Sequence, residues 1–96
     1  MELDLEKSNR LSRMVAGYYK HSGISGEALA AKLDFRSGLK RLFALVGGST
    51  LGWRFSDACP AATALSHHYG VPASTIWSHI LEDGVLPDAD MAEGLD

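Results

Sequence analysis

The chain has 96 residues, of which 46% are apolar and 22% charged, so it can fill one modest core and is not disordered by composition. No apolar run approaches the roughly 18 residues of a membrane span, and the acidic first residues lack the apolar stretch of a secretory signal. The single cysteine excludes a disulfide framework, so we expect a cytoplasmic protein. A domain this small rarely contains a complete cofactor-dependent enzyme, so we expect neither catalysis nor a cofactor.

The formal net charge of −3 is unevenly distributed along the chain. All nine Lys and Arg residues lie within residues 1–54, which also carry five acidic residues and so have a formal charge of +4. Residues 55–96 contain seven acidic residues and neither Lys nor Arg, which gives −7. Such a split indicates two surfaces with different partners, or head-to-tail self-association between copies of the chain. The alternative is that the charges are distributed by chance in a short chain.

Helical patterns begin near the N-terminus. Apolar residues spaced i, i+3, i+4 and i+7 predict a helix over about residues 4–21, which Gly23 ends in the left-handed conformation. Ser25 is the predicted N-cap of a second, alanine-rich helix, Gly26–Leu33. The chain is then expected to turn a corner at residues 34–35.

A third helix is predicted to follow, with Ser37 as its N-cap. Glycines 47 and 48 are expected to end this helix, because glycine readily leaves the helical conformation. The residues that form its apolar stripe are Leu39, Leu42, Phe43 and Val46.

Residues 49–58 permit two interpretations. Trp53 and Phe55 alternate with smaller or polar residues, as in a strand, yet a loop that buries both rings fits equally well. Pro60 suits the first turn of a fourth helix, because a proline N–H is not needed there. We expect Gly70 to close that helix.

A fifth helix is predicted to run from Ser74, as its N-cap, to Gly84. After Pro87 the chain is acidic and has little to bury, so residues 87–96 are expected to form a flexible tail. The predicted fold is therefore all-α, with four or five short helices around one core in a single domain of residues 1–86. The apolar stripes of the last two helices are Ala61, Leu65, Tyr69, Ile76 and Ile80.

Residues 64–80 resemble the helix-turn-helix of phage-repressor-like DNA-binding proteins. Gly70 suits the positive φ of the turn, and Val71 suits the corner between the two helices. The resemblance implies a helix-turn-helix at about residues 61–82, whose second helix enters the major groove. The DNA contacts that it implies are Ser74, Thr75, Ser78 and His79.

That second helix carries no Lys or Arg, although neutralised phosphates supply much of the affinity for DNA. Residues 28–37 repeat the apolar pattern of residues 64–73. When Ser74 is skipped in this alignment, Leu39 aligns with Ile76 and Phe43 with Ile80. This copy is basic, so we expect it to contact nucleic acid if the repeat is structural. A solvated helix face is the alternative. The residues concerned are Arg36, Ser37, Lys40 and Arg41.

Two functions remain open at this point. The resemblance favours a small DNA-binding transcriptional regulator that binds double-stranded DNA as a homodimer, because single motifs gain affinity from two half-sites. The acidic second part of the chain favours a non-catalytic protein inhibitor or anti-activator that docks on a nucleic-acid-binding partner through Trp77, Glu82 and Asp83. Cys59 and the histidines lack the spacing of zinc ligands, so we expect no metal site.

Overall fold

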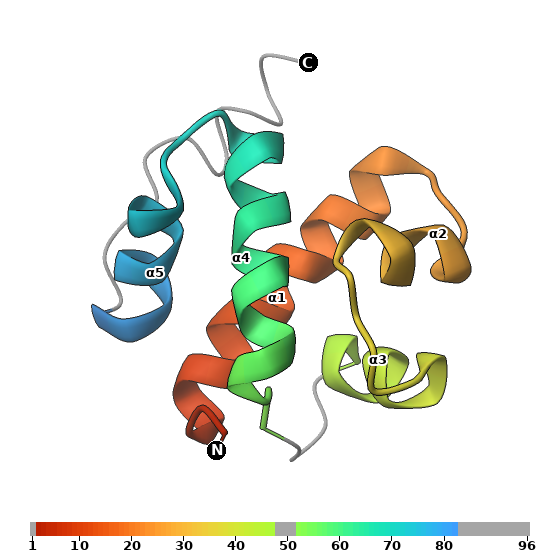
Figure 1. Ribbon diagram of the computed structural model, residues 1–96, viewed down its shortest axis with the longest axis horizontal. Helices are drawn as coiled ribbons and strands as arrows, with labels where there is room; N and C mark the ends of the chain where they lie inside the picture. Colours follow the sequence, from red (N-terminus) through yellow and green to blue (C-terminus); the bar gives the residue numbers. More distant parts are fainter. Residues whose placement is uncertain (1, 48–51, 83–96) are drawn as a thin grey trace.

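The computed structural model describes residues 2–47 and 52–82, which form five α-helices and no β-strand. An all-α fold with four or five helices is thereby confirmed. Within the described ranges no helix is long and apolar enough to cross a membrane. The expected helix end at Gly84 and the expected tail, residues 87–96, lie outside the described residues. The helices are α1 (Leu5–Ser22), α2 (Gly26–Lys32), α3 (Leu39–Val46), α4 (Phe55–Tyr69) and α5 (Ala73–Glu82) (Figure 1).

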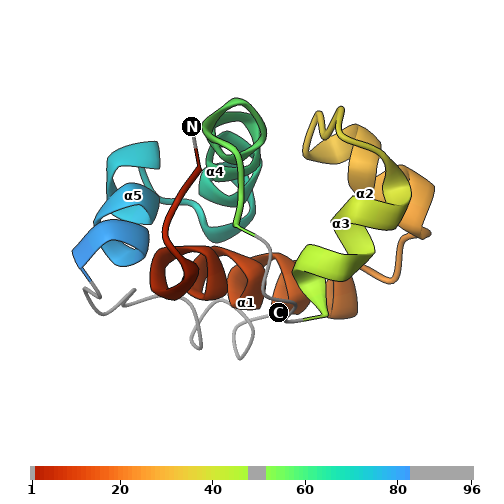
Figure 2. The same cartoon turned by 90° about the horizontal axis from the view of Figure 1, so that it is seen from below.

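Helix α1 forms the base of the molecule. Seen from below, it lies across the structure, with α4 and α5 above one half and α2 and α3 above the other (Figure 2). It packs against α3, α4 and α5, whereas α2 packs against α3. The buried face of α1 includes Ser8, Arg10 and Ser12 beside its apolar residues, so this helix brings polar groups into the interior that need partners.

Three predicted helix boundaries are confirmed by their local geometry. Gly23 and Gly70 both have φ of 68°, the left-handed conformation that ends α1 and α4. The Ser25 hydroxyl accepts a hydrogen bond of 3.1 Å from the backbone N–H of Ala28, so it caps α2 as predicted. Asp34 turns the corner after α2 with a φ of 50°, which aspartate tolerates better than most residues.

The two other serine caps were predicted wrongly. Helix α3 has Gly38 at its N-cap position and no side-chain cap, because the Ser37 hydroxyl instead donates to Asp57 of α4. Helix α5 begins at Ala73, so Ser74 lies inside its first turn rather than before it. The predicted caps lie one residue (α3) and two residues (α5) from the observed N-cap positions, since sequence alone does not show which partner a serine hydroxyl finds.

Helix α4 begins earlier than predicted. It starts at Phe55, so Pro60 lies inside the helix rather than in its first turn. There Pro60 cannot donate a hydrogen bond to the Ser56 carbonyl oxygen, which costs the helix one internal bond. The backbone N–H groups of Asp57 and Ala58 both donate to the Arg54 carbonyl oxygen, and these contacts set the start of the helix.

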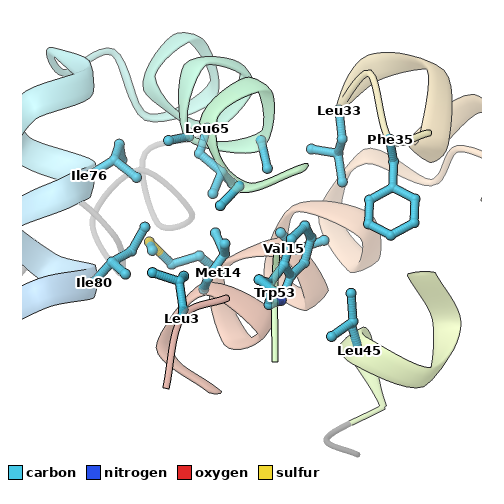
Figure 3. Close-up of a cluster of buried hydrophobic side chains, with 14 of the residues drawn as sticks. Leu3, Met14, Val15, Leu33, Phe35, Leu45, Trp53, Leu65, Ile76 and Ile80 are labelled. Carbon is cyan, nitrogen blue, oxygen red and sulfur yellow. The ribbon is translucent and has the colours of Figure 1, made fainter. Parts of the chain in front are cut away.

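Trp53 lies at the centre of the core, between α1 and the α2–α3 connection (Figure 3). Its ring is fully buried and meets Phe35 edge to face, with 5.6 Å between ring centroids. Its indole N–H donates to the Ser12 Oγ atom at 2.9 Å, and its backbone N–H donates to the Ser8 Oγ atom at 2.9 Å. The buried serines of α1 thus satisfy both Trp53 donors. The loop interpretation holds for Trp53 but was wrong for Phe55, which is half-buried and begins α4.

The apolar face of α3 differs from the predicted stripe. Leu42 and Leu45 are buried, whereas Phe43 remains 41% exposed. The Phe43 ring lies over Gly26, where a Cβ atom would come within 2.2 Å of it, and it meets the Tyr19 ring at a centroid distance of 6.1 Å. The face of α3 that packs against the core is therefore rotated about the helix axis relative to the face that the sequence spacing predicted.

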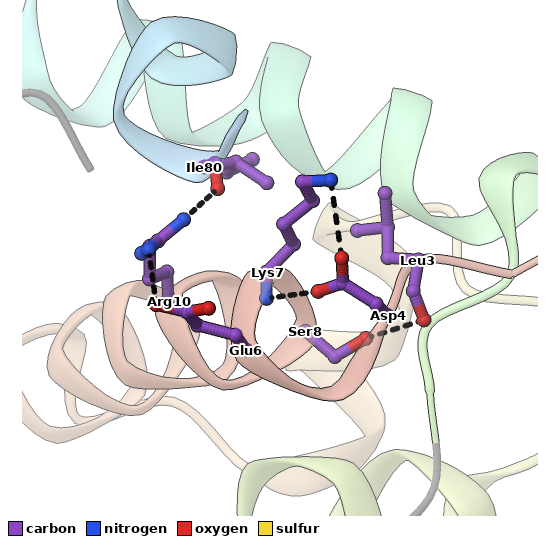
Figure 4. A network of polar contacts seen from close by, with 7 residues as sticks. All are labelled: Leu3, Asp4, Glu6, Lys7, Ser8, Arg10 and Ile80. Atoms are coloured by element: carbon purple, nitrogen blue, oxygen red, sulfur yellow. Dashed lines mark hydrogen bonds and ion pairs between the residues drawn. The ribbon is translucent and has the colours of Figure 1, made fainter. Parts of the chain in front are cut away.

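Arg10 connects α1 to the last turn of α5 (Figure 4). Its guanidinium donates to the Ile80 carbonyl oxygen and to Glu6 Oε1, both at 2.8 Å. Carbonyls in the last turn of a helix have no N–H partner within that helix, so Arg10 supplies one. At the start of α1, the backbone N–H and ammonium of Lys7 hold the pKa of the Asp4 carboxyl below its usual value.

Replacing Gly70 should destabilise the corner between α4 and α5. No atom lies within 4 Å of the position of an added Cβ, so Gly70→Val should cost about 1–2 kcal/mol through backbone conformation alone. Gly70→Asn should cost less, because asparagine tolerates positive φ. Urea unfolding followed by circular dichroism measures both, and equal stability of Gly70→Val and the parent would contradict the turn geometry.

Candidate nucleic-acid interface

A three-residue turn, residues 70–72, joins α4 to α5. The Val71 backbone N–H donates to the Ser66 carbonyl oxygen at 3.1 Å, and the Val71 side chain packs against the core while remaining half-exposed. The four inward residues that the sequence analysis assigned to this corner are all buried. They are Leu65, Tyr69, Ile76 and Ile80.

The outward side of α5 is uncharged. Ser74 and Ser78 are exposed, and Thr75 and His79 are half-buried. Between Ala73 and Leu81 this helix has no Lys, Arg, Asp or Glu. It therefore offers hydroxyl and imidazole groups to a partner but no fixed positive charge for a phosphate.

The predicted internal repeat holds for the first helix of the pair only. Leu29, Leu33 and Phe35 are buried, as are Leu65 and Tyr69 in the corresponding part of the other copy. The second helices do not correspond. The α2–α3 connection spans residues 33–38, compared with three residues between α4 and α5, and α3 buries Leu42 and Leu45 where the alignment required Leu39 and Phe43. Two helix corners are present, but their second helices face the core differently.

A buried carboxylate on α4 holds the α2–α3 connection in place. Asp57 is only 2% exposed, and its two oxygens accept hydrogen bonds from the backbone N–H of Arg36 and the hydroxyl of Ser37. The Ser37 oxygen in turn accepts a hydrogen bond of 3.5 Å from the Arg54 guanidinium. This chain of contacts brings the connection and the start of α4 together, although the residues are about 20 apart in sequence.

Two exposed arginines lie at this anchor, Arg36 of the connection and Arg54 at the N-cap of α4, and the exposed Lys40 follows in the first turn of α3. We call them the basic surface. The Arg36 side chain is 82% exposed, and its Nε atom lies 3.3 Å from Asp34 Oδ1. Arg36 and Lys40 were expected from the sequence, whereas Arg54 was not.

Arg41, which the sequence also offered as a DNA contact, is engaged within the protein. Its side chain is 18% exposed, donates to the Gly52 carbonyl oxygen at 2.9 Å and lies 3.6 Å from Glu2. Its Nε atom is buried without a hydrogen-bond partner among the described residues. Gly52 lies so close to the N-terminal segment that a Cβ atom there would be 2.6 Å from the Leu3 carbonyl oxygen. Arg41 thus braces a close approach of two chain segments.

Replacing Arg41 should therefore affect stability rather than ligand binding. Arg41→Met keeps the length of the side chain but removes its hydrogen bond and ion pair, so we expect a loss of about 1 kcal/mol. Chemical denaturation measures this loss. Binding of the variant to DNA should match that of the parent, and a variant of full stability with weakened binding would show that Arg41 contacts the ligand.

The acidic character of the second part of the chain belongs mainly to residues outside the described ranges. Five of its seven acidic residues lie within residues 83–96. Of the other two, Asp57 is buried and Glu82 ends α5. Residues 2–47 and 52–82 together contain nine Lys and Arg against seven Asp and Glu, a formal charge of +2.

The residues expected for a protein-binding face are partly engaged or not described. The Trp77 ring is half-buried and stacks on Phe55, with 6.5 Å between centroids and an interplanar angle of 21°. The structure does not describe the side chain of Glu82 or any part of Asp83. Cys59 is an exposed free thiol, and among the described residues no three His, Cys, Asp or Glu side chains are grouped closely enough to hold a metal ion.

Comparisons with protein-family models, with curated proteins and with solved structures gave no match. Sequence reasoning missed Arg54 and Asp57, because both lie in the segment that permitted two interpretations. An acidic residue shortly before an Ala-rich helical stretch was the available signal for an earlier start of α4.

Proposed function

We propose that this protein is a small DNA-binding regulator that contacts the phosphate backbone of duplex DNA through the basic surface. The observation that carries the proposal is the contact of the α2–α3 connection with α4, which places Arg36 and Arg54 at the Asp57–Ser37 hydrogen bond, with Lys40 in the first turn of α3 that follows. Anchoring of the connection limits the conformational freedom that these side chains lose on binding. Exposed cations held on neighbouring, anchored segments are the electrostatic pattern of a phosphate-binding surface.

Helix α5 contributes less to this proposal than the sequence suggested. Phosphate contacts position a protein on DNA and supply most of its non-specific affinity, and α5 has no Lys or Arg to make them. Ser74 and Ser78 remain available for hydrogen bonds to bases or phosphates. The buried corner between α4 and α5 supports the helix-turn-helix resemblance at the level of helix packing. We assign α5 no role in affinity.

Removing the three charges should flatten the salt dependence of DNA binding. Each phosphate contact contributes about 0.9 to the slope of log affinity against log salt concentration, so Arg36→Gln, Lys40→Gln and Arg54→Gln together should lower that slope by about 2 to 3. Fluorescence anisotropy with a labelled duplex of mixed sequence measures it. Lys20→Gln, on the exposed side of α1, is the matched control and should leave the slope unchanged. An unchanged slope in the triple variant would refute the proposal.

The inhibitor alternative receives less support from the described residues. The Trp77 ring, which that alternative uses as an anchor, is half-buried and stacks on Phe55. Homodimer formation remains a prediction that sedimentation of the protein with and without duplex tests directly. A dimer that forms only on DNA would accord with two half-sites.

A further inference from the structure

A second polar feature lies on the molecule, built from side chains that the basic surface does not include. Tyr18 of α1, Lys32 of α2, and Ala64, His67 and His68 of α4 line an open hollow of about 410 Å³. The consecutive helices α1 and α2 and the more distant α4 supply its walls. Its volume falls in the range of about 300–1,000 Å³ that is typical of sites for small ligands.

The polar groups of this hollow are not engaged elsewhere. Within residues 2–47 and 52–82, the Lys32 ammonium, the Tyr18 hydroxyl and the two imidazoles form no hydrogen bond or ion pair. The contacts of His68 are with rings: its centroid lies 4.7 Å from that of Tyr18 and 4.8 Å from that of Tyr69. Ring packing thus holds His68 in place while its nitrogens remain available.

The chemistry of these groups favours an anion. One ammonium, two imidazoles and a phenol can all donate hydrogen bonds, and among the described residues no carboxylate lines the hollow. We propose that the hollow binds a small phosphate-bearing ligand. A carboxylate is planar and is best matched by the fork of an arginine, whereas a tetrahedral phosphate accepts hydrogen bonds from several separate donors around it. Lysine is a frequent phosphate ligand because it acts as a point charge.

This inference goes beyond DNA binding and does not depend on it. The ligand would occupy a recess between α1, α2 and α4, whereas duplex DNA would contact cations that project from the α2–α3 connection and the start of α4. Phosphate in the hollow could come from a small molecule or from a nucleic acid. The hollow shape favours the small molecule, because the phosphates of a duplex lie along a convex backbone.

The first experiment titrates the protein with inorganic phosphate at constant pH and ionic strength. NMR signals of the His67 and His68 imidazoles should shift and saturate with a dissociation constant of about 1 mM or lower, while sodium chloride at equal ionic strength should cause no shift. Absence of saturable shifts would overturn the proposal. Addition of duplex DNA then distinguishes a small molecule from a nucleic acid as the source of the phosphate. If inorganic phosphate stays bound in the presence of the duplex, the hollow is a small-molecule site. If the duplex displaces the phosphate, that assignment is overturned.

A pair of matched double variants identifies the residues. Lys32→Gln with His67→Gln should weaken phosphate binding at least about tenfold, because it removes the ammonium and one donor of the hollow. Lys20→Gln with His21→Gln changes the same residue types at exposed positions of α1 and should not weaken it. Lys40→Gln, on the basic surface, should weaken DNA binding and leave phosphate binding intact. Equal phosphate affinity of the Lys32 variant and the parent would refute the site, and circular dichroism verifies the fold of each.

Discussion

Trp53→Ala should destabilise the protein by about 3–5 kcal/mol, the range for removing a large buried aromatic side chain. Trp53 is fully buried, packs against Phe35, and donates hydrogen bonds to two serines of α1. Its loss leaves a cavity between α1 and the α2–α3 connection and leaves the Ser12 hydroxyl without its donor. Since small domains are stable by about 5–15 kcal/mol in total, the variant should be partly unfolded at physiological temperature.

Two milder variants separate packing from hydrogen bonding. Ser12→Ala removes the acceptor of the indole N–H and should cost about 1–3 kcal/mol, because that N–H stays buried. Trp53→Phe keeps an aromatic ring and should fall between Ser12→Ala and Trp53→Ala. Urea unfolding monitored by circular dichroism gives all three free energies. A midpoint for Trp53→Ala equal to that of the parent would contradict the position of this residue in the core.

Reversing charge on the basic surface should have the largest effect on function. Lys40→Glu with Arg54→Glu replaces two cations by carboxylates, which would then face the phosphates that the cations are proposed to contact. Such like-charge juxtaposition costs several kcal/mol. Since about 2.8 kcal/mol corresponds to a hundredfold, we expect duplex binding to weaken by more than about a hundredfold. Both side chains are exposed, but Arg54 also donates to Ser37, so circular dichroism and urea unfolding of the double variant verify that the fold is retained.

The matched control reverses one arginine and one lysine on α1. Arg13→Glu with Lys20→Glu changes the net charge by the same amount at exposed positions away from the α2–α3 connection. Long-range electrostatics alone would weaken binding equally in both double variants, and that outcome would contradict a localised contact surface. Anisotropy titrations with one labelled duplex compare the two directly.

Helix boundaries set by local chemistry were predictable from the sequence. The left-handed glycines 23 and 70 and the Ser25 cap each depend on residues within one helical turn, and each was predicted correctly. The buried stripes of α4 and α5 followed from 3.6-residue periodicity, which is most informative in long segments. The all-α fold class rested on these signals.

Features that depend on distant partners were not predictable. The burial of the Asp57 carboxylate depends on donors from the α2–α3 connection, and Ser37 is drawn away from its expected cap by that same carboxylate. Arg41 appeared free to contact DNA, because nothing in its neighbourhood along the chain indicates the Gly52 carbonyl oxygen. The hollow lined by Lys32 and His67 arises only when three helices pack together. Sequence patterns carry local preferences and contain little information about such pairings.

The location of the DNA contact is the central claim, and an NMR titration tests it most directly. Isotope-labelled protein is titrated with a mixed-sequence duplex at about 50 mM salt, where electrostatic association is strong. The proposal predicts that the amide signals that shift most are those of residues 34–40 and 54–57, around the basic surface. Shifts confined to residues 73–81 of α5, or no shifts at all, would contradict it.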